Sequence, residues 1–336
     1  MSVATLLQPT ATEAAFIRQA KQICNDLMPH SPAIYWLDFL ASIGISWAAL
    51  IVCLNAEMGS VTQVVAFVVA GFLLYRSSVF THELAHMSPT RFRTFRVVWN
   101  VLFGIPFLMP TFLYTDHRVH HTNQTYGTPG DAEYFPYAHK SVWSLLGSLL
   151  VVLIVPALPL IRFGILGPVS WLHPKLRRWV WQKASSLGTL SPKYVRDDAD
   201  ADERRAVIWQ EPACAAVVLG LAVSLATGWL SWTSFALIWG VYVFANLWNN
   251  FRVWASHRYV STGEPMTFLD QMLDSTTIPT PLGILWAPLG MRYHALHHLF
   301  PAMPYHAMGA AHHRLMRQLP PDSPYHRTVV RSLPAA

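Results

Sequence analysis

The sequence has few charged residues and few cysteines, and each shortage excludes a class of protein. Charged residues make up only 12% of the 336 positions, whereas hydrophobic residues make up 53%, and the mean hydropathy is +0.30. Soluble domains carry about twice that share of charge, so the composition indicates a membrane protein. Cys24, Cys53 and Cys214 lie far apart and form no Cys-x-x-Cys pair. We therefore expect neither a disulfide framework nor a thiolate metal site.

The first 30 residues lack the basic segment and the following apolar segment of a signal peptide. Instead, Thr10 and Glu13 have the spacing of a capping box, and apolar residues recur on one side of the following stretch. We expect an amphipathic helix within residues 1–30. It lies either on the membrane surface or on the protein itself.

A net charge of +6 does not point to a nucleic acid partner in this chain. The basic residues lie in loops between apolar segments, which is the pattern of a cytoplasmic membrane face. We therefore expect membrane lipids, and no nucleic acid, among its partners.

Four apolar segments are expected to cross the membrane as two helical hairpins, namely residues 34–54, 61–80, 212–230 and 235–250. The short loops 55–60 and 229–233 contain no Lys or Arg, which places both on the outside. Two further apolar runs are interrupted by prolines. We expect residues 97–114 to be interfacial or re-entrant, and residues 142–166 to dip in and return or to lie flat. Both termini are then cytoplasmic.

Histidine, in contrast, is concentrated in three clusters at helical spacing. Their members are His82, His86, His117, His120, His121, His294, His297 and His298. Histidines at i, i+3 and i+4 share one helical face, so each cluster could bind a metal ion. Eight imidazoles exceed the needs of one ion, so two ions are implied. Imidazole suits iron, copper, nickel and zinc alike, so the residues alone leave the metal open.

The first cluster also admits a different interpretation. His82-Glu83-x-x-His86 is the motif of zinc metalloproteases, in which the glutamate is the general base. That interpretation leaves the histidines of the other two clusters unexplained. A metal carrier without enzymatic activity is a further class, and counting the bound metals distinguishes these classes.

Taken together, the clusters resemble the histidine boxes of the membrane fatty acid desaturase superfamily. The runs His120-His121-Thr122-Asn123, Asp131-Ala132-Glu133-Tyr134-Phe135-Pro136 and His297 to Met308 look like those of acyl-lipid desaturases. The resemblance covers roughly residues 82–319. It implies an all-α, multi-pass membrane protein with four transmembrane helices in two hairpins and a cytoplasmic helical cap that holds a di-iron site. We expect an N-terminal segment 1–30, a desaturase domain 31–320 and a C-terminal tail 321–336.

The resemblance also implies the ligands of the two iron ions. A ninth histidine is expected between the second hairpin and the third box, where His257 lies. The implied ligands are His82, His86, His117, His120, His121, His257, His294, His297 and His298. Asp131 and Glu133 could orient ligating imidazoles, or could simply cap a loop. The acyl-CoA branch has an asparagine four residues before the ninth histidine, where this chain has Val253. The resemblance therefore does not extend to a water ligand held by that asparagine.

The activity implied is that of an oxygen-dependent di-iron desaturase, which introduces a double bond into a fatty acyl lipid and needs no catalytic residue beyond the metal centre. Hydroxylation or ketolation of an alkyl, lipid or carotenoid substrate is the alternative, since His82-Glu83-Leu84-Ala85-His86 also resembles the first box of alkane hydroxylases. The chain has no His-Pro-Gly-Gly haem motif, so we expect a separate electron donor of the ferredoxin, rubredoxin or cytochrome b5 type. We expect the bacterial inner membrane, with the active site on its cytoplasmic side.

Overall fold

The regular structure of the protein is entirely helical in the part of the chain that its computed structural model describes, residues 10–331 apart from 89, 136 and 188–192. The long helices are α3 (Pro32–Asn55), α4 (Val61–His86), α11 (Ala201–Ala226) and α12 (Trp232–Ser256). The shorter ones are α2 (Ala11–Cys24), α5 (Arg93–Trp99), α6 (His117–His120), α7 (Val142–Val152), α8 (Ala157–Ile161), α9 (Gly167–Ser170), α10 (Pro174–Ala184), α13 (Phe268–Asp274), α14 (Gly283–Trp286), α15 (His294–Leu299) and α16 (Tyr305–Gln318). Isolated bridges join His257 to Ser275 and Thr277 to Val329.

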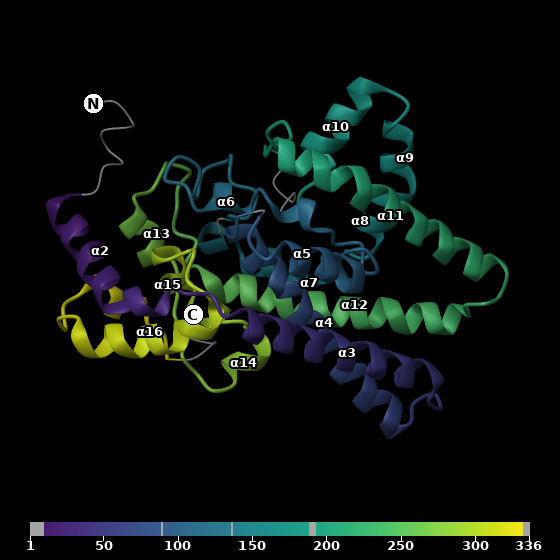
Figure 1. Cartoon of the computed structure of the whole chain (residues 1–336), viewed down its shortest axis with the longest axis horizontal. Helices are drawn as coiled ribbons and strands as arrows, with labels where there is room; N and C mark the ends of the chain where they lie inside the picture. Colours follow the sequence, from purple (N-terminus) through teal and green to yellow (C-terminus); the bar gives the residue numbers. More distant parts are fainter. Residues whose placement is uncertain (1–9, 89, 136, 188–192, 332–336) are drawn as a thin grey trace.

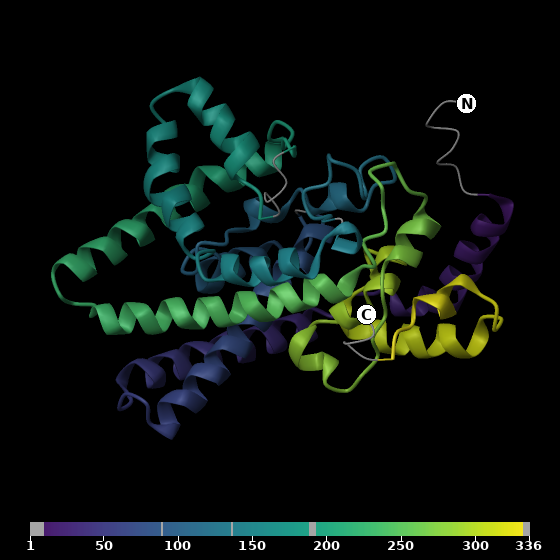
Figure 2. The same ribbon diagram turned by 180° about the vertical axis from the view of Figure 1, so that it is seen from behind.

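The long helices extend to one side of the molecule, and the C-terminal helices gather at the other. In Figure 1 the turns α3–α4 and α11–α12 lie on the right, whereas α2, α13, α15 and α16 lie on the left. The view from behind shows the same separation (Figure 2). The two hairpin turns therefore lie at the opposite end from the third histidine box, which is on α15.

The first hairpin follows the prediction closely. α3 begins at Pro32, a residue suited to the first helical turn, and the side chain of Ser60 caps α4. One face of α3, with Tyr35, Phe39 and Ile43, is buried in the main apolar core. α4 does not end at residue 80 as expected but continues to His86, because no glycine or proline lies between residues 72 and 86. The first box is therefore part of the long helix itself.

The second hairpin differs from the prediction in its bounds. α11 begins at Ala201 rather than at residue 212, because Asp200 and Glu203 form a capping box and the helix continues through Pro212. α12 continues to Ser256, beyond the predicted residue 250. α3, α4 and α11 are long and apolar enough to cross a membrane, whereas α12 is of similar length but does not reach the same mean hydropathy over 18 residues. Four crossings stay a prediction.

The two interrupted apolar runs form short helices. Residues 97–114 hold the end of α5, a π-helical turn Asn100–Gly104 and a 3-10 turn Thr111–Tyr114, and no helix of spanning length. The second run bends by 53° between Val142–Val152 and Ala157–Ser170. Pro156 lies directly before α8, where it ends the preceding helical stretch. A break at this proline agrees with the prediction, and the path of this segment through the membrane stays a prediction.

The predicted N-terminal helix packs on the protein. The capping box of Thr10 and Glu13 is confirmed, since each side chain accepts the other residue's backbone N–H. Phe16, Ala20 and Cys24 are buried in the apolar cluster that includes residues of α15 and α16. This contact holds α2 against the end of the molecule that carries the third histidine box.

Candidate metal centre

The three histidine boxes and His257 lie on different elements. His82 and His86 are on the last turns of α4, and the second box forms the single turn α6, with His121 as its C-cap. The third box is on α15. His257 is the C-cap of α12 and has an extended backbone. Helix geometry therefore sets the relative positions of the histidines within each box, whereas His257 lies just after a helix and is not positioned in this way.

The structure brings all nine histidines together in two groups whose ligand atoms lie within 4.8 Å of one another in each group. The first group contains His82, His86, His117, His121 and His297. The second contains His120, His257, His294 and His298. In both His-x-x-His-His boxes the i and i+4 histidines share a group, and the i+3 histidine belongs to the other. Each of these two boxes therefore contributes to both groups.

The ring nitrogens approach one another as ligands of a common ion would. Nε2 of His121 lies 3.2 Å from Nε2 of His117 and 3.0 Å from Nε2 of His297. Nε2 of His257 lies 3.0 Å from Nε2 of His294. Two nitrogens at about 2.1 Å from one ion, at a right angle, are about 3.0 Å apart. The spacing therefore fits coordination of a metal ion in each group.

Burial and protonation state fit the same interpretation. Several buried ring nitrogens have no hydrogen-bond partner among the described residues, including both nitrogens of His82 and of His298. Burial, with a further contribution from neighbouring charged groups, holds the pKa well below the ordinary value of 6.5 for His121, His257, His294, His297 and His298. Neutral imidazoles have a lone pair for a metal, and a bound ion satisfies the orphaned nitrogens.

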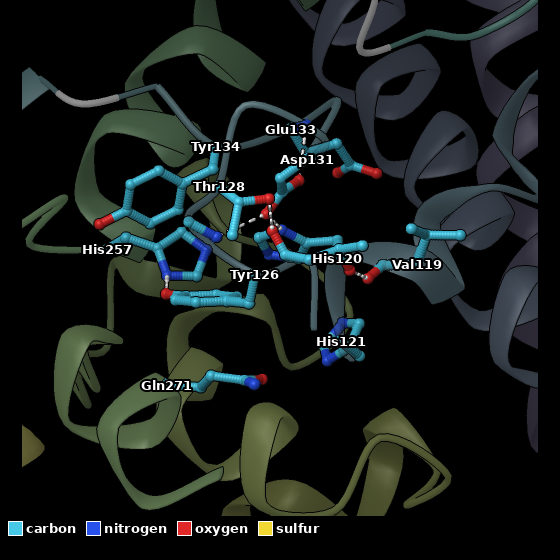
Figure 3. Close-up of polar contacts among 12 residues, drawn as sticks. Val119, His120, His121, Tyr126, Thr128, Asp131, Glu133, Tyr134, His257 and Gln271 are labelled. Atoms are coloured by element: carbon cyan, nitrogen blue, oxygen red, sulfur yellow. Dashed lines mark hydrogen bonds and ion pairs between the residues drawn. The ribbon is translucent and has the colours of Figure 1, made fainter. Parts of the chain in front are cut away.

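Asp131 and Glu133 lie where carboxylates that orient ligating imidazoles would lie. Oδ2 of Asp131 is 2.8 Å from Nδ1 of His120, and Oε1 of Glu133 is 2.7 Å from Nδ1 of His117. Burial alone would raise the pKa of Glu133, but the His117 imidazole holds it at about 2. Burial lowers the pKa of His120, but the Asp131 carboxylate raises it by more, so that the pKa of His120 lies above its ordinary value. Figure 3 shows Asp131 beside His120. Each carboxylate hydrogen-bonds to Nδ1 of its histidine and so leaves Nε2 as the nitrogen that is available to a metal ion.

Sequence reasoning missed a second set of polar residues, next to His257. The hydroxyl of Tyr126 is 2.9 Å from Nδ1 of His257, a contact drawn in Figure 3, and donates to Oδ2 of Asp274 at 2.7 Å. Burial and the Asp274 carboxylate raise the pKa of Tyr126 well above its ordinary value. Asp274 follows Leu273 at the end of α13, and its only signal in the sequence is one acidic residue in an amphipathic stretch. It is nevertheless only 2% exposed.

Glu83 is not positioned as the general base of a protease. Its carboxylate accepts hydrogen bonds from the Tyr35 hydroxyl and from the Tyr305 backbone N–H. These contacts join α4 to α3 and to the start of α16. Glu83 therefore has a bridging role between helices, and it belongs to neither histidine group.

Two histidines outside the boxes hydrogen-bond to other protein groups. His306 Nε2 accepts the backbone N–H of Ser31, and His312 hydrogen-bonds to the Tyr325 hydroxyl. Val253, at the position of the asparagine in the acyl-CoA branch, offers only its backbone oxygen, which accepts from Tyr259. Asn249 accepts from Arg252 on its own helix.

Comparison with known proteins agrees with the resemblance. The family model described as fatty acid desaturase matches residues 59–329. A protein of Caulobacter vibrioides (strain NA1000 / CB15N) named ceramide hydroxylase is 36% identical over 325 residues, which cover 95% of this chain and 91% of that protein. No solved structure matches. Both names describe oxidoreductases that act on lipids. The chain therefore belongs to the membrane fatty acid desaturase superfamily.

Proposed function

We propose that this protein is an oxygen-dependent di-iron hydroxylase that adds a hydroxyl group to a hydrocarbon chain of a ceramide-like membrane lipid. The observation that carries this proposal is the 36% identity to a ceramide hydroxylase over nearly the whole of both chains. The two histidine groups could hold the metal ions that such a reaction needs.

The comparison favours the alternative from the sequence over its main prediction, which was desaturation. Both reactions begin with removal of one hydrogen from a methylene group. They diverge when the carbon radical either receives oxygen or loses a second hydrogen. Placement of the chain within a fraction of an ångström decides between them, and motif spacing does not report that placement. Desaturation stays the second candidate, because the family model and the run from His297 to Met308 resemble desaturases.

The nine histidines would hold two iron ions, five in one group and four in the other. The bound iron pair would supply activation of dioxygen and oxidation of an unactivated C–H bond. The imidazoles that would hold the ions are neutral donors, a ligand type that suits iron. The protein's own part is to present Nε2 atoms, which Asp131 and Glu133 support by holding Nδ1 of His120 and His117.

Hydroxylation consumes dioxygen, two electrons and two protons, and it yields the alcohol and water. The chain needs an external donor for the electrons, because its cysteines Cys24, Cys53 and Cys214 are separate and buried and cannot hold an iron–sulfur cluster. We propose a separate ferredoxin, rubredoxin or cytochrome b5 as this donor. Arg91 and Arg93 are exposed, and within the described residues neither forms an ion pair, so they could attract an acidic protein.

We propose a bacterial inner membrane location, with both termini and the metal centre on the cytoplasmic side. Both hairpin turns lie at the end of the molecule opposite α15. The first box and His257 lie at the other ends of α4 and α12. Four crossings would therefore place the whole centre on one side.

The test is lipid analysis of cells that express the protein under ¹⁸O₂. We expect ceramides that have gained one ¹⁸O atom. His297→Ala should abolish this product, whereas His139→Ala, which removes an exposed histidine outside both groups, should retain it. A product that has lost two hydrogens and gained no oxygen would contradict hydroxylation and support desaturation.

A further inference from the structure

We propose that Tyr126 and Asp274 are positioning residues that fix the ring of His257 and thereby help the four-histidine group to retain its metal ion. This role rests on the proposed function only in that the group binds a metal, and it is independent of the product formed. Tyr126 follows the second box and Asp274 ends α13, so the contact joins residues that are 148 positions apart.

The hydrogen bonds determine which ring nitrogen of His257 carries the hydrogen. A hydroxyl group has a single hydrogen to donate. The Tyr126 hydroxyl donates to Asp274 Oδ2 at 2.7 Å, and the Ser275 hydroxyl donates to the backbone oxygen of Gln271 at 2.8 Å. Both hydroxyls also lie near Nδ1 of His257, at 2.9 and 3.1 Å. Since their hydrogens are already in use, both accept from Nδ1–H, and Nε2 keeps its lone pair for the metal.

Asp274 sets the direction of the Tyr126 hydroxyl. Its carboxylate accepts from the hydroxyls of Tyr126 and Tyr134, at 2.7 and 2.9 Å, and from the backbone N–H of Val260 at 3.1 Å. Without this acceptor, the Tyr126 hydrogen could turn toward Nδ1 of His257. That arrangement would favour the tautomer with its hydrogen on Nε2, and an Nε2 that carries a hydrogen has no lone pair for the metal.

The hydrogen bond between Tyr126 and His257 matters for the four-histidine group because no helical turn or carboxylate orients the ring of His257 directly, whereas these orient the rings of its other members. His294 and His298 are held by α15, and His120 is held by Asp131. His257 has an extended backbone, with φ −133° and ψ 160°, so no helical turn directs its ring. Misorientation of His257 leaves this group with three ligands, whereas the other group keeps five.

The experiment compares two tyrosine variants of the purified full chain loaded with Fe²⁺. Tyr126→Phe and Tyr134→Phe each remove one hydroxyl from the same oxygen of Asp274, but only Tyr126 contacts a histidine nitrogen. Metal per chain is measured during titration with a chelator. Loss of a group that supports a ligand weakens metal binding by about 10- to 100-fold. We expect Tyr126→Phe to lose one of two ions at a chelator concentration lower by about that factor, and Tyr134→Phe to match the wild type.

A second pair of variants and a second measurement exclude a general loss of folding. Asp274→Asn should behave as Tyr126→Phe does, whereas Asp270→Asn, at an exposed position of the same helix, should not. Rotation of a ligating ring changes the ligand field, so Co²⁺-loaded Tyr126→Phe should show a shifted visible spectrum. Equal metal retention in Tyr126→Phe and Tyr134→Phe would overturn the positioning role alone. A wild type that binds no metal would overturn both this role and the proposed function.

Discussion

Gly127→Ala is expected to destabilise the loop after the second histidine box by about 2–5 kcal/mol. Gly127 has φ +72°, where an alanine costs about 1–2 kcal/mol. A Cβ at this position would also lie 2.7 Å from Oγ and 2.8 Å from Cβ of Ser261. Relief of that overlap displaces Ser261, whose hydroxyl donates to the Gly127 oxygen at 2.9 Å, and adds about 1–3 kcal/mol.

Gly59→Ala is the matched control. Gly59 has φ +77°, but nothing lies within 4 Å of its added Cβ, so this variant reports the backbone strain alone. The apparent melting temperature of each variant is measured in the same detergent. The melting temperature of Gly127→Ala should fall further than that of Gly59→Ala, and a second change, Ser261→Gly, should restore part of the difference. Equal losses in the two alanine variants would refute the packing argument.

Three further outcomes are expected. Acidification should lower the free energy of unfolding below about pH 6.5 and leave it unaffected by these histidines above that value, because burial holds the pKa of the buried histidines well below 6.5 in the folded chain and the unfolded chain therefore takes up protons first; a melting temperature that stays constant from pH 7 to pH 5 would contradict this. Glu211→Gln should cost about 3–5 kcal/mol of unfolding free energy, measured by thermal unfolding, since it removes the charge that pairs with buried Arg162 at 2.6 Å; a melting temperature equal to the wild type would contradict it. Single cysteines at Ser60 and Ser231 should react with a membrane-impermeant label from outside, and one at Lys175 should not; outside labelling at Lys175 would contradict the cytoplasmic location of the centre.

Histidine spacing predicts the members of the three boxes, but it does not predict how they divide between the two groups. All nine candidate ligands come together, eight of them expected from the spacing of the boxes and His257 from the resemblance. His294 and His298 are one turn apart and share a group, whereas His297 points to the other. The spacing was expected to place each box on one face with one ion, and the structure instead divides both His-x-x-His-His boxes between the two groups.

Contacts between distant segments are not encoded in local spacing. Asp274 and Tyr126 meet only because the loop after the second box packs on the segment after α12, through Ser261 and Gly127. A buried aspartate in an amphipathic helix looks the same in sequence as an exposed one. Its role depends on the three groups that donate to it, and these come from other parts of the chain.

Helix ends were predicted less well than helix existence. Pro212 suggested the start of a helix, but the capping box at Asp200 starts α11 earlier and the proline is accommodated inside it. In a long helix the loss of one backbone hydrogen bond is offset by packing and by the other bonds of the helix. The choice between hydroxylation and desaturation depends on the position of a lipid chain, which neither helix ends nor motif spacing reports.

The metal content of the purified chain tests the central claim most directly, namely that nine histidines hold an iron pair. Protein from cells grown with ⁵⁷Fe is analysed for metal per chain and by Mössbauer spectroscopy. We predict two irons per chain with the signature of an interacting pair, and a greater loss of iron in His298→Ala, which leaves three histidines in its group, than in His297→Ala, which leaves four. A single zinc per chain, or full iron content in both variants, would contradict the account.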